Sequence, residues 1–86
     1  MRTIHKYVLP LQSQAVIMLL SPHHQVVHVA EQHHELTVWI EIYKDEPRVK
    51  KRFYVVATGG AVPENATHRG TALMSDGLVW HVYEEP

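Results

Sequence analysis

The 86 residues carry a formal net charge of −1 with histidine neutral, and none of them is cysteine. The absence of cysteine excludes disulfide bonds and thiolate metal sites and fits a cytosolic protein. The near-neutral charge argues against a general nucleic-acid binder, which must neutralise phosphates. No run reaches the roughly 18–20 apolar residues that span a bilayer, and no signal-peptide pattern opens the chain. We expect one small soluble intracellular domain over residues 1–86, with homo-oligomerisation supplementing its core.

The first half of the chain predicts short strands. Residues 3–9 form a first strand, ended by Pro10, and residues 15–20 are an apolar run whose length favours a buried strand. A short helix around Met18 is the alternative for that run. After a turn at residues 21–24, residues 26–30 alternate as a third strand.

The clearest pattern lies at residues 36–43, where Leu36, Val38, Ile40 and Ile42 alternate with more polar positions. Such strict alternation is typical of a half-buried strand. Residues 44–47 have the composition of a hairpin loop, so residues 49–58 are expected to return as its partner strand. A Gly-Gly turn and a polar loop follow, and residues 78–83 form a final strand that must pair within a sheet.

About six short strands with short connections predict an all-β fold, a small antiparallel β-sandwich or barrel. In either architecture, Trp39, Tyr43 and Tyr54 are expected on faces away from the core. Aromatic residues there serve either as core or oligomer packing or as a platform on which a ligand stacks. We take Trp39 and Tyr54 as candidate ligand-binding residues.

Histidine is unusually frequent, with eight residues, five of them between His23 and His34. Neutral imidazole is a common metal ligand. Along a straight strand, however, His24 and His28 lie about 13 Å apart, too far to share one ion. We therefore interpret these residues as exposed histidines and predict no metal site and no cofactor.

Two further groups are candidates for binding. Gly59 and Gly60, with His68 and Arg69, combine turn amides with a guanidinium and so suit an anion such as phosphate, although the segment is not a P-loop. A tight turn beside a solvent-exposed arginine is the alternative. Lys50, Lys51 and Arg52 form a basic run that either protects a sheet edge, paired across the hairpin with Glu41, Asp45 and Glu46, or docks a partner. No serine, histidine and aspartate pattern indicates catalysis, and we predict that the protein is not an enzyme.

The chain resembles a family of short, uncharacterised proteins from tailed phages and prophages. The resemblance covers the whole length and is most specific in ATGGAVP, residues 57–63, and in HRGTALMSDGLVWHVYEE, residues 68–85. Ala57-Thr58-Gly59-Gly60 stands where the family has Gly-Thr-Gly-His, so a loop histidine does not carry over. The resemblance implies a phage origin, a β-rich fold and expression in the cytoplasm of an infected bacterium, and it brings no catalytic residues.

Small phage accessory proteins often antagonise host defence, and this class-level expectation shapes the predicted function. We expect a non-enzymatic binding protein that sequesters a nucleotide-derived immune signal. One alternative is a protein–protein inhibitor that masks a host defence nuclease or effector, and a second is a structural component of the virion. The first prediction uses Gly59, Gly60, His68, Arg69, Trp39 and Tyr54; the inhibitor uses Lys50, Lys51 and Arg52.

Overall fold

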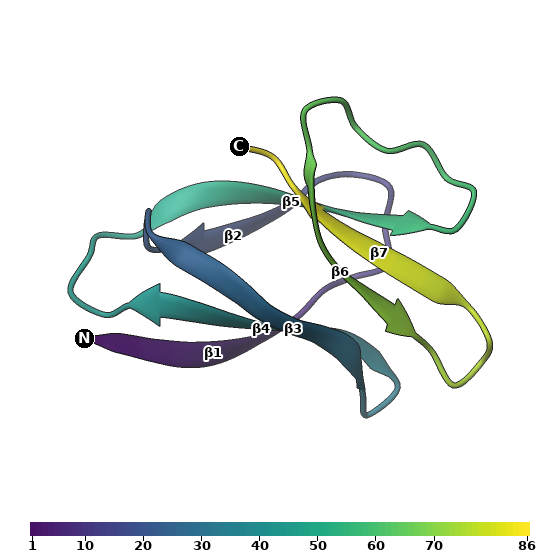
Figure 1. The fold of residues 1–86 in the computed structure, drawn as a ribbon, viewed down its shortest axis with the longest axis horizontal. Helices are drawn as coiled ribbons and strands as arrows, with labels where there is room; N and C mark the ends of the chain where they lie inside the picture. Colours follow the sequence, from purple (N-terminus) through teal and green to yellow (C-terminus); the bar gives the residue numbers. More distant parts are fainter.

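The computed structural model describes all residues 1–86 as two antiparallel sheets that pack on each other (Figure 1). The three-stranded sheet has the order β1-β4-β3, and the four-stranded sheet has the order β2-β5-β7-β6. The strands are β1 (Arg2–Val8), β2 (Val16–Leu20), β3 (His24–Gln32), β4 (Glu35–Tyr43), β5 (Val49–Ala57), β6 (Thr67–Leu73) and β7 (Val79–Glu84). This confirms the predicted all-β sandwich, with seven strands where about six were expected.

The alternation in β4 positions the core. Leu36, Val38, Ile40 and Ile42 are all buried, as predicted. Strand β4 is the central strand of its sheet, and this row of side chains faces the other sheet. There it packs with Phe53 of β5 and Val82 of β7 in one cluster of 13 buried residues. The core therefore lies between the two sheets, and the opposite face of each sheet points away from it.

The predicted hairpin between residues 36–43 and 49–58 is wrong. Strand β4 pairs with β1 and β3, whereas β5 pairs with β2 and β7. Residues 44–48 therefore cross from one sheet to the other. The apolar alternation shows which face of each strand is buried, but it does not show which strands pair along the edges, so the local pattern did not distinguish the two arrangements.

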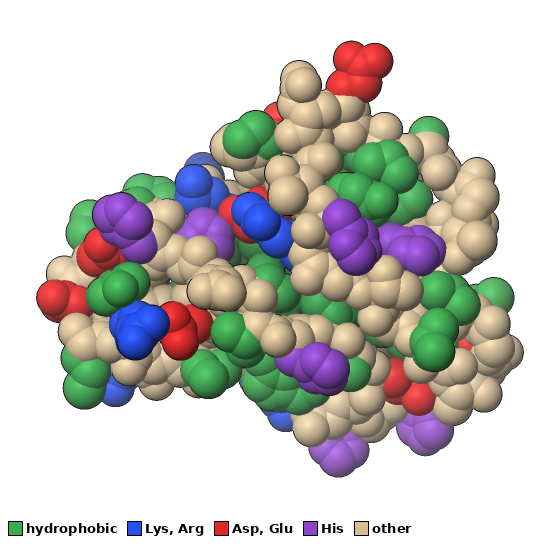
Figure 2. Space-filling view, in the orientation of Figure 1, with side chains coloured by type: hydrophobic (Ala, Val, Ile, Leu, Met, Phe, Trp, Pro, Cys, Tyr) green, Lys and Arg blue, Asp and Glu red, His purple; other side chains and the backbone are tan.

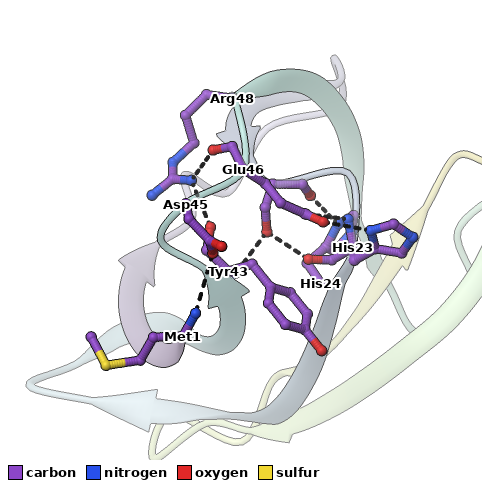
Figure 3. A network of polar contacts seen from close by, with 8 residues as sticks. Met1, His23, His24, Tyr43, Asp45, Glu46 and Arg48 are labelled. Atoms are coloured by element: carbon purple, nitrogen blue, oxygen red, sulfur yellow. Dashed lines mark hydrogen bonds and ion pairs between the residues drawn. The ribbon is translucent and has the colours of Figure 1, made fainter.

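The crossing is held by contacts with the turn before β3 (Figure 3). Arg48 donates to the carbonyl oxygens of Tyr43 at 3.1 Å and of Glu46 at 3.2 Å. The Glu46 carboxylate lies 2.7 Å from Nδ1 of His23 and accepts the His23 amide at 3.1 Å. The hydrogen bond from the His23 side chain is the main reason why the pKa of the Glu46 carboxyl is lowered from its usual value.

The charge pairs expected across that hairpin do not form either. Glu41 binds Arg2 at 2.9 Å, and Asp45 binds the terminal amino group of Met1 at 3.2 Å. These partners come from β1 and the N-terminus because β1, not β5, lies beside β4.

The strand expected at residues 15–20 is confirmed as β2. It buries Met18 and Leu20 and exposes Ile17 and Leu19 as a strand does, so the alternative helix around Met18 is absent. One expectation needs correction, because residues 67–73 were expected to be part of a loop and form strand β6. Only Ala72 of its seven residues is buried, and the sequence therefore carries no apolar alternation that would indicate a strand. The final strand β7 does pair as predicted, between β5 and β6.

Candidate binding face

The outer face of the four-stranded sheet carries a row of aromatic side chains across three strands. Tyr54 of β5 is the cross-strand partner of Tyr83 of β7, and Tyr83 is in turn the partner of His68 of β6. The rings of His68 and Tyr83 meet edge to face, with centroids 5.3 Å apart. Because Phe53 and Val55, on either side of Tyr54, are buried in the core, Tyr54 and its row point outward.

Threonine hydroxyl groups beside this aromatic row hold the imidazole rings of His68 and His81. His81 of β7 has Thr58 Oγ1 at 2.9 Å from Nε2 and Thr71 Oγ1 at 2.9 Å from Nδ1. The same Thr71 oxygen lies 2.9 Å from Nε2 of His68. A neutral imidazole has one donor and one acceptor nitrogen, and hydroxyl groups serve both. The two histidines are therefore held in fixed orientations on the face.

Gly59 and Gly60 lie beside this aromatic row. Gly59 has a φ of 90°, a conformation that favours glycine, and the amide of Gly60 donates to the carbonyl oxygen of Ala57 at 2.8 Å. That amide is therefore used within the turn. A hollow of about 180 Å³ lies between the turn and the sheet, and it is lined by residues 56–60, Val62, His81 and Tyr83. The structure thus brings Gly59 and Gly60 beside the aromatic row that contains His68 and Tyr54.

Arg69 does not join this group. It lies at a β-bulge between His68 and Gly70, and its Nε donates to Oε1 of Glu84 at 2.9 Å. Glu84 is only 4% exposed. Its other carboxylate oxygen lies 2.6 Å from Nε2 of the buried His24, whose Nδ1 is 2.8 Å from the carbonyl oxygen of Ser21. Arg69, itself partly exposed, therefore binds to a buried carboxylate in a network that links β6, β7 and β3. Sequence reasoning missed this network because its members are far apart in the chain.

Trp39 lies in the other sheet. Its cross-strand partners in the three-stranded sheet are Lys6 and His28, and its ring centroid is 5.6 Å from that of His28. Since Tyr54 belongs to the four-stranded sheet, the two residues do not form one stacking platform. The residue that lies beside Tyr54 is Tyr83, which the sequence analysis did not select.

The basic run adjoins the aromatic row. Lys50 and Arg52 alternate along β5 with the same parity as Tyr54, so they share its outer face, while Lys51 has the opposite parity. All three basic residues line a hollow of about 220 Å³ together with Glu85 and Pro86. Arg52 lies 3.7 Å from the Glu85 carboxylate, which also accepts the Tyr54 hydroxyl at 3.3 Å. Cations and aromatic rings thus follow one another along one strand.

A pocket of about 500 Å³ lies at the margin of β5 rather than on the outer face. Its lining comprises Leu11, Gln12, Ser13, residues 54–57, Gly60, Ala61, Pro63 and Trp80, none of which is charged. The buried Nε1 of Trp80 has no hydrogen-bond partner. Sequence reasoning did not find this pocket, because no local pattern shows that residues 11–13 lie beside β5.

The histidines do not gather in one place. Figure 2 shows them at several separate positions on one face of the molecule. No group of three or more histidine, cysteine, aspartate or glutamate residues is arranged to hold a metal ion. His33 and His34 occupy the turn between β3 and β4, both with positive φ.

The architecture defines a small β-sandwich domain with an aromatic and basic outer sheet face. A family model described as "Domain of unknown function (DUF7352)" matches residues 1–86, and the chain belongs to that family. Neither a curated protein nor a solved structure matches the chain. Nothing helical in the structure has the length and hydropathy that crossing a lipid bilayer requires.

Proposed function

We propose that this protein is a non-enzymatic binding protein that captures a nucleotide-derived immune signal on the outer face of its four-stranded sheet. The observation that carries the proposal is the continuity of the Tyr54–Tyr83–His68 row with Lys50 and Arg52 on the same face. Bases stack on aromatic side chains, and lysine and arginine bind phosphates. One face therefore offers both halves of a nucleotide a chemically suitable partner.

The proposal assigns the phosphate contacts to Lys50 and Arg52. Arg69 was the sequence-based candidate, but its Nε is bound to the buried Glu84 carboxylate. The sequence-based candidates for base stacking were Trp39 and Tyr54. We now assign this role to Tyr54 and Tyr83, which are cross-strand neighbours. Gly59, Gly60 and His68 were also sequence-based candidates for phosphate binding. Because the Gly60 amide already donates to the Ala57 carbonyl, we now assign these three residues to the surroundings of the bound ligand.

A trap of this kind needs affinity rather than turnover, so the proposed activity requires no catalytic residue. The resemblance to short tailed-phage proteins supports a role in the cytoplasm of an infected bacterium, where removing a signal would antagonise antiviral defence. Homo-oligomerisation would add binding surface between subunits, and pockets commonly form there.

Calorimetry with cyclic dinucleotides and ADP-ribose derivatives tests the proposal. We expect saturable binding by the wild-type protein and a loss of about fivefold or more for Tyr83→Ala, since stacking contributes about 1–3 kcal/mol per base. Arg52→Glu should weaken binding comparably, whereas Lys44→Glu, in the crossing between the sheets, should not. A folded protein that gives no heat with any of these ligands rules the proposal out.

A protein–protein inhibitor is the second candidate, and one observation favours it. Ile17 and Leu19 are 46% and 58% exposed and lie directly opposite Arg52 and Lys50 on the same face. Exposed apolar residues next to cations suit an acidic protein surface, such as that of a defence nuclease or effector. In a defence assay, reversing the charges of Lys50, Lys51 and Arg52 should abolish inhibition. Leu19→Asp separates the candidates, because it should disrupt masking while leaving nucleotide binding intact.

A further inference from the structure

One side of β5 is paired along only part of its length. Strand β2 covers Val49 to Phe53, but no strand lies beside residues 54–57 on that side, while β7 pairs with them on the other. The amide of Glu85 donates to the Arg52 carbonyl, and the amide of Thr58 donates to the Val79 carbonyl, so the even-numbered residues of β5 bond to β7. Val55 and Ala57 therefore direct their backbone groups toward the unpaired side. The Ala57 carbonyl already accepts the Gly60 amide at 2.8 Å, so the groups open to a partner are the Val55 amide and carbonyl and the Ala57 amide.

The unpaired side forms part of the wall of the 500 Å³ pocket. The chain bends at residues 13–14, just before β2, so that Leu11, Gln12 and Ser13 form a separate wall. Gly60, Ala61 and Pro63 from the connection after β5 also line the pocket, as does Trp80. The site thus combines backbone hydrogen-bonding groups with an uncharged, mostly apolar lining.

We propose that this pocket binds an extended, uncharged segment of a partner protein, which adds as a strand to the Val55–Ala57 side of β5 and places an apolar side chain in the pocket. An extended backbone is the chemistry that satisfies unpaired strand amides and carbonyls, and apolar pockets beside such edges select alternate side chains. The segment is uncharged because the lining offers no charged partner.

The pocket selects this occupant over two others. A nucleotide would find no lysine or arginine for its phosphates among the lining residues. In a second copy of the chain, the same side of β5 is enclosed by residues 11–13 and by the connection after β5. These segments would keep the two β5 strands from pairing with each other. This strand-addition site goes beyond the proposed function, which uses the outer face of the sheet.

Binding is measured by NMR with acetylated, amidated seven-residue peptides in which threonine alternates with valine, leucine, isoleucine or phenylalanine. We expect saturable shifts of the Val55 and Ala57 amides and of the Trp80 indole. Ala57→Pro removes an amide that faces the unpaired side, and it should weaken binding at least tenfold. Ala57→Ser keeps the amide and should bind like the wild type. Ala61→Trp, which fills the pocket from an exposed position, should also abolish binding.

Three outcomes overturn the proposal. They are the absence of any shift with all four peptides, equal affinity for Ala57→Pro and Ala57→Ser, and shifts confined to His68 and Tyr83 on the outer face. Tyr83→Ala serves as the reference for the nucleotide site and should leave peptide affinity unchanged. Failure of strand addition is thereby distinguished from failure of the proposed nucleotide binding.

Discussion

At the scale of single residues, the buried network around Glu84 is the most informative feature. Its carboxylate accepts Arg69 Nε at 2.9 Å and lies 2.6 Å from His24 Nε2. Since a carbonyl oxygen only accepts, His24 Nδ1 donates to Ser21, and His24 Nε2 faces the Glu84 carboxylate. Three strands from two sheets are joined through this one side chain.

Replacing Glu84 by glutamine should destabilise the fold. Glutamine has only one acceptor oxygen where the carboxylate offers one to Arg69 and one to His24, so one of these hydrogen bonds is lost, and we expect a loss of about 1–3 kcal/mol in the free energy of unfolding. Glu85→Gln is the matched control: its carboxylate is 44% exposed and lies 3.7 Å from Arg52, so the change should stay within about 0.5 kcal/mol. Urea denaturation measures both, and equal effects would contradict the assignment.

Gly70 marks a close approach between the sheets. A Cβ at this position would lie 2.4 Å from Cγ2 and 2.8 Å from Cβ of Val29, on β3 of the opposite sheet. Gly70→Ala should therefore reduce the free energy of unfolding by about 1–3 kcal/mol, as overpacking does. Adding Val29→Ala removes the nearest atom, so the double variant should cost less than the sum of the single changes. Additive losses in urea denaturation would show that the two residues are not in contact.

At the scale of elements, the turn between β3 and β4 is strained. Gln32 pairs with Glu35, which leaves His33 and His34 as a two-residue turn with φ values of 52° and 64°. Such turns favour Asn-Gly, because other residues with a Cβ are disfavoured at positive φ. We expect His33→Asn with His34→Gly to raise the free energy of unfolding by about 1 kcal/mol, and hence the melting temperature by about 4–8 °C. The double alanine variant should give no gain, since it keeps the unfavourable backbone.

At the scale of the whole molecule, β7 holds the four-stranded sheet together. It lies between β5 and β6, and it contributes Val82 to the core and Glu84 to the buried network. Truncation after Gly77 removes this strand and separates β6 from the rest of its sheet. We expect the truncated chain to lose cooperative thermal unfolding in circular dichroism, whereas removing only Glu85 and Pro86 should preserve it. Cooperative unfolding of the longer truncation would contradict the assembly described here.

The sequence by itself determined the strands whose side chains alternate between core and solvent. The positions of Leu36, Val38, Ile40 and Ile42 predict both the strand and its buried face, because that period reflects the geometry of one strand alone. The apolar residues of β7 likewise predict a paired final strand. Thr67–Leu73 could not be predicted in this way, since an edge strand with one buried residue has no such period.

Only the tertiary structure decided which strands are neighbours and which side chains meet. The sequence suggested Gly59, Gly60, His68 and Tyr54, and the sheet brings them together; it also suggested Arg69 and Trp39, which the bulge and the opposite sheet hold elsewhere. Tyr83 became part of the face through its register with Tyr54. Register and layer depend on contacts between residues distant in the chain, and a local pattern carries no information about them.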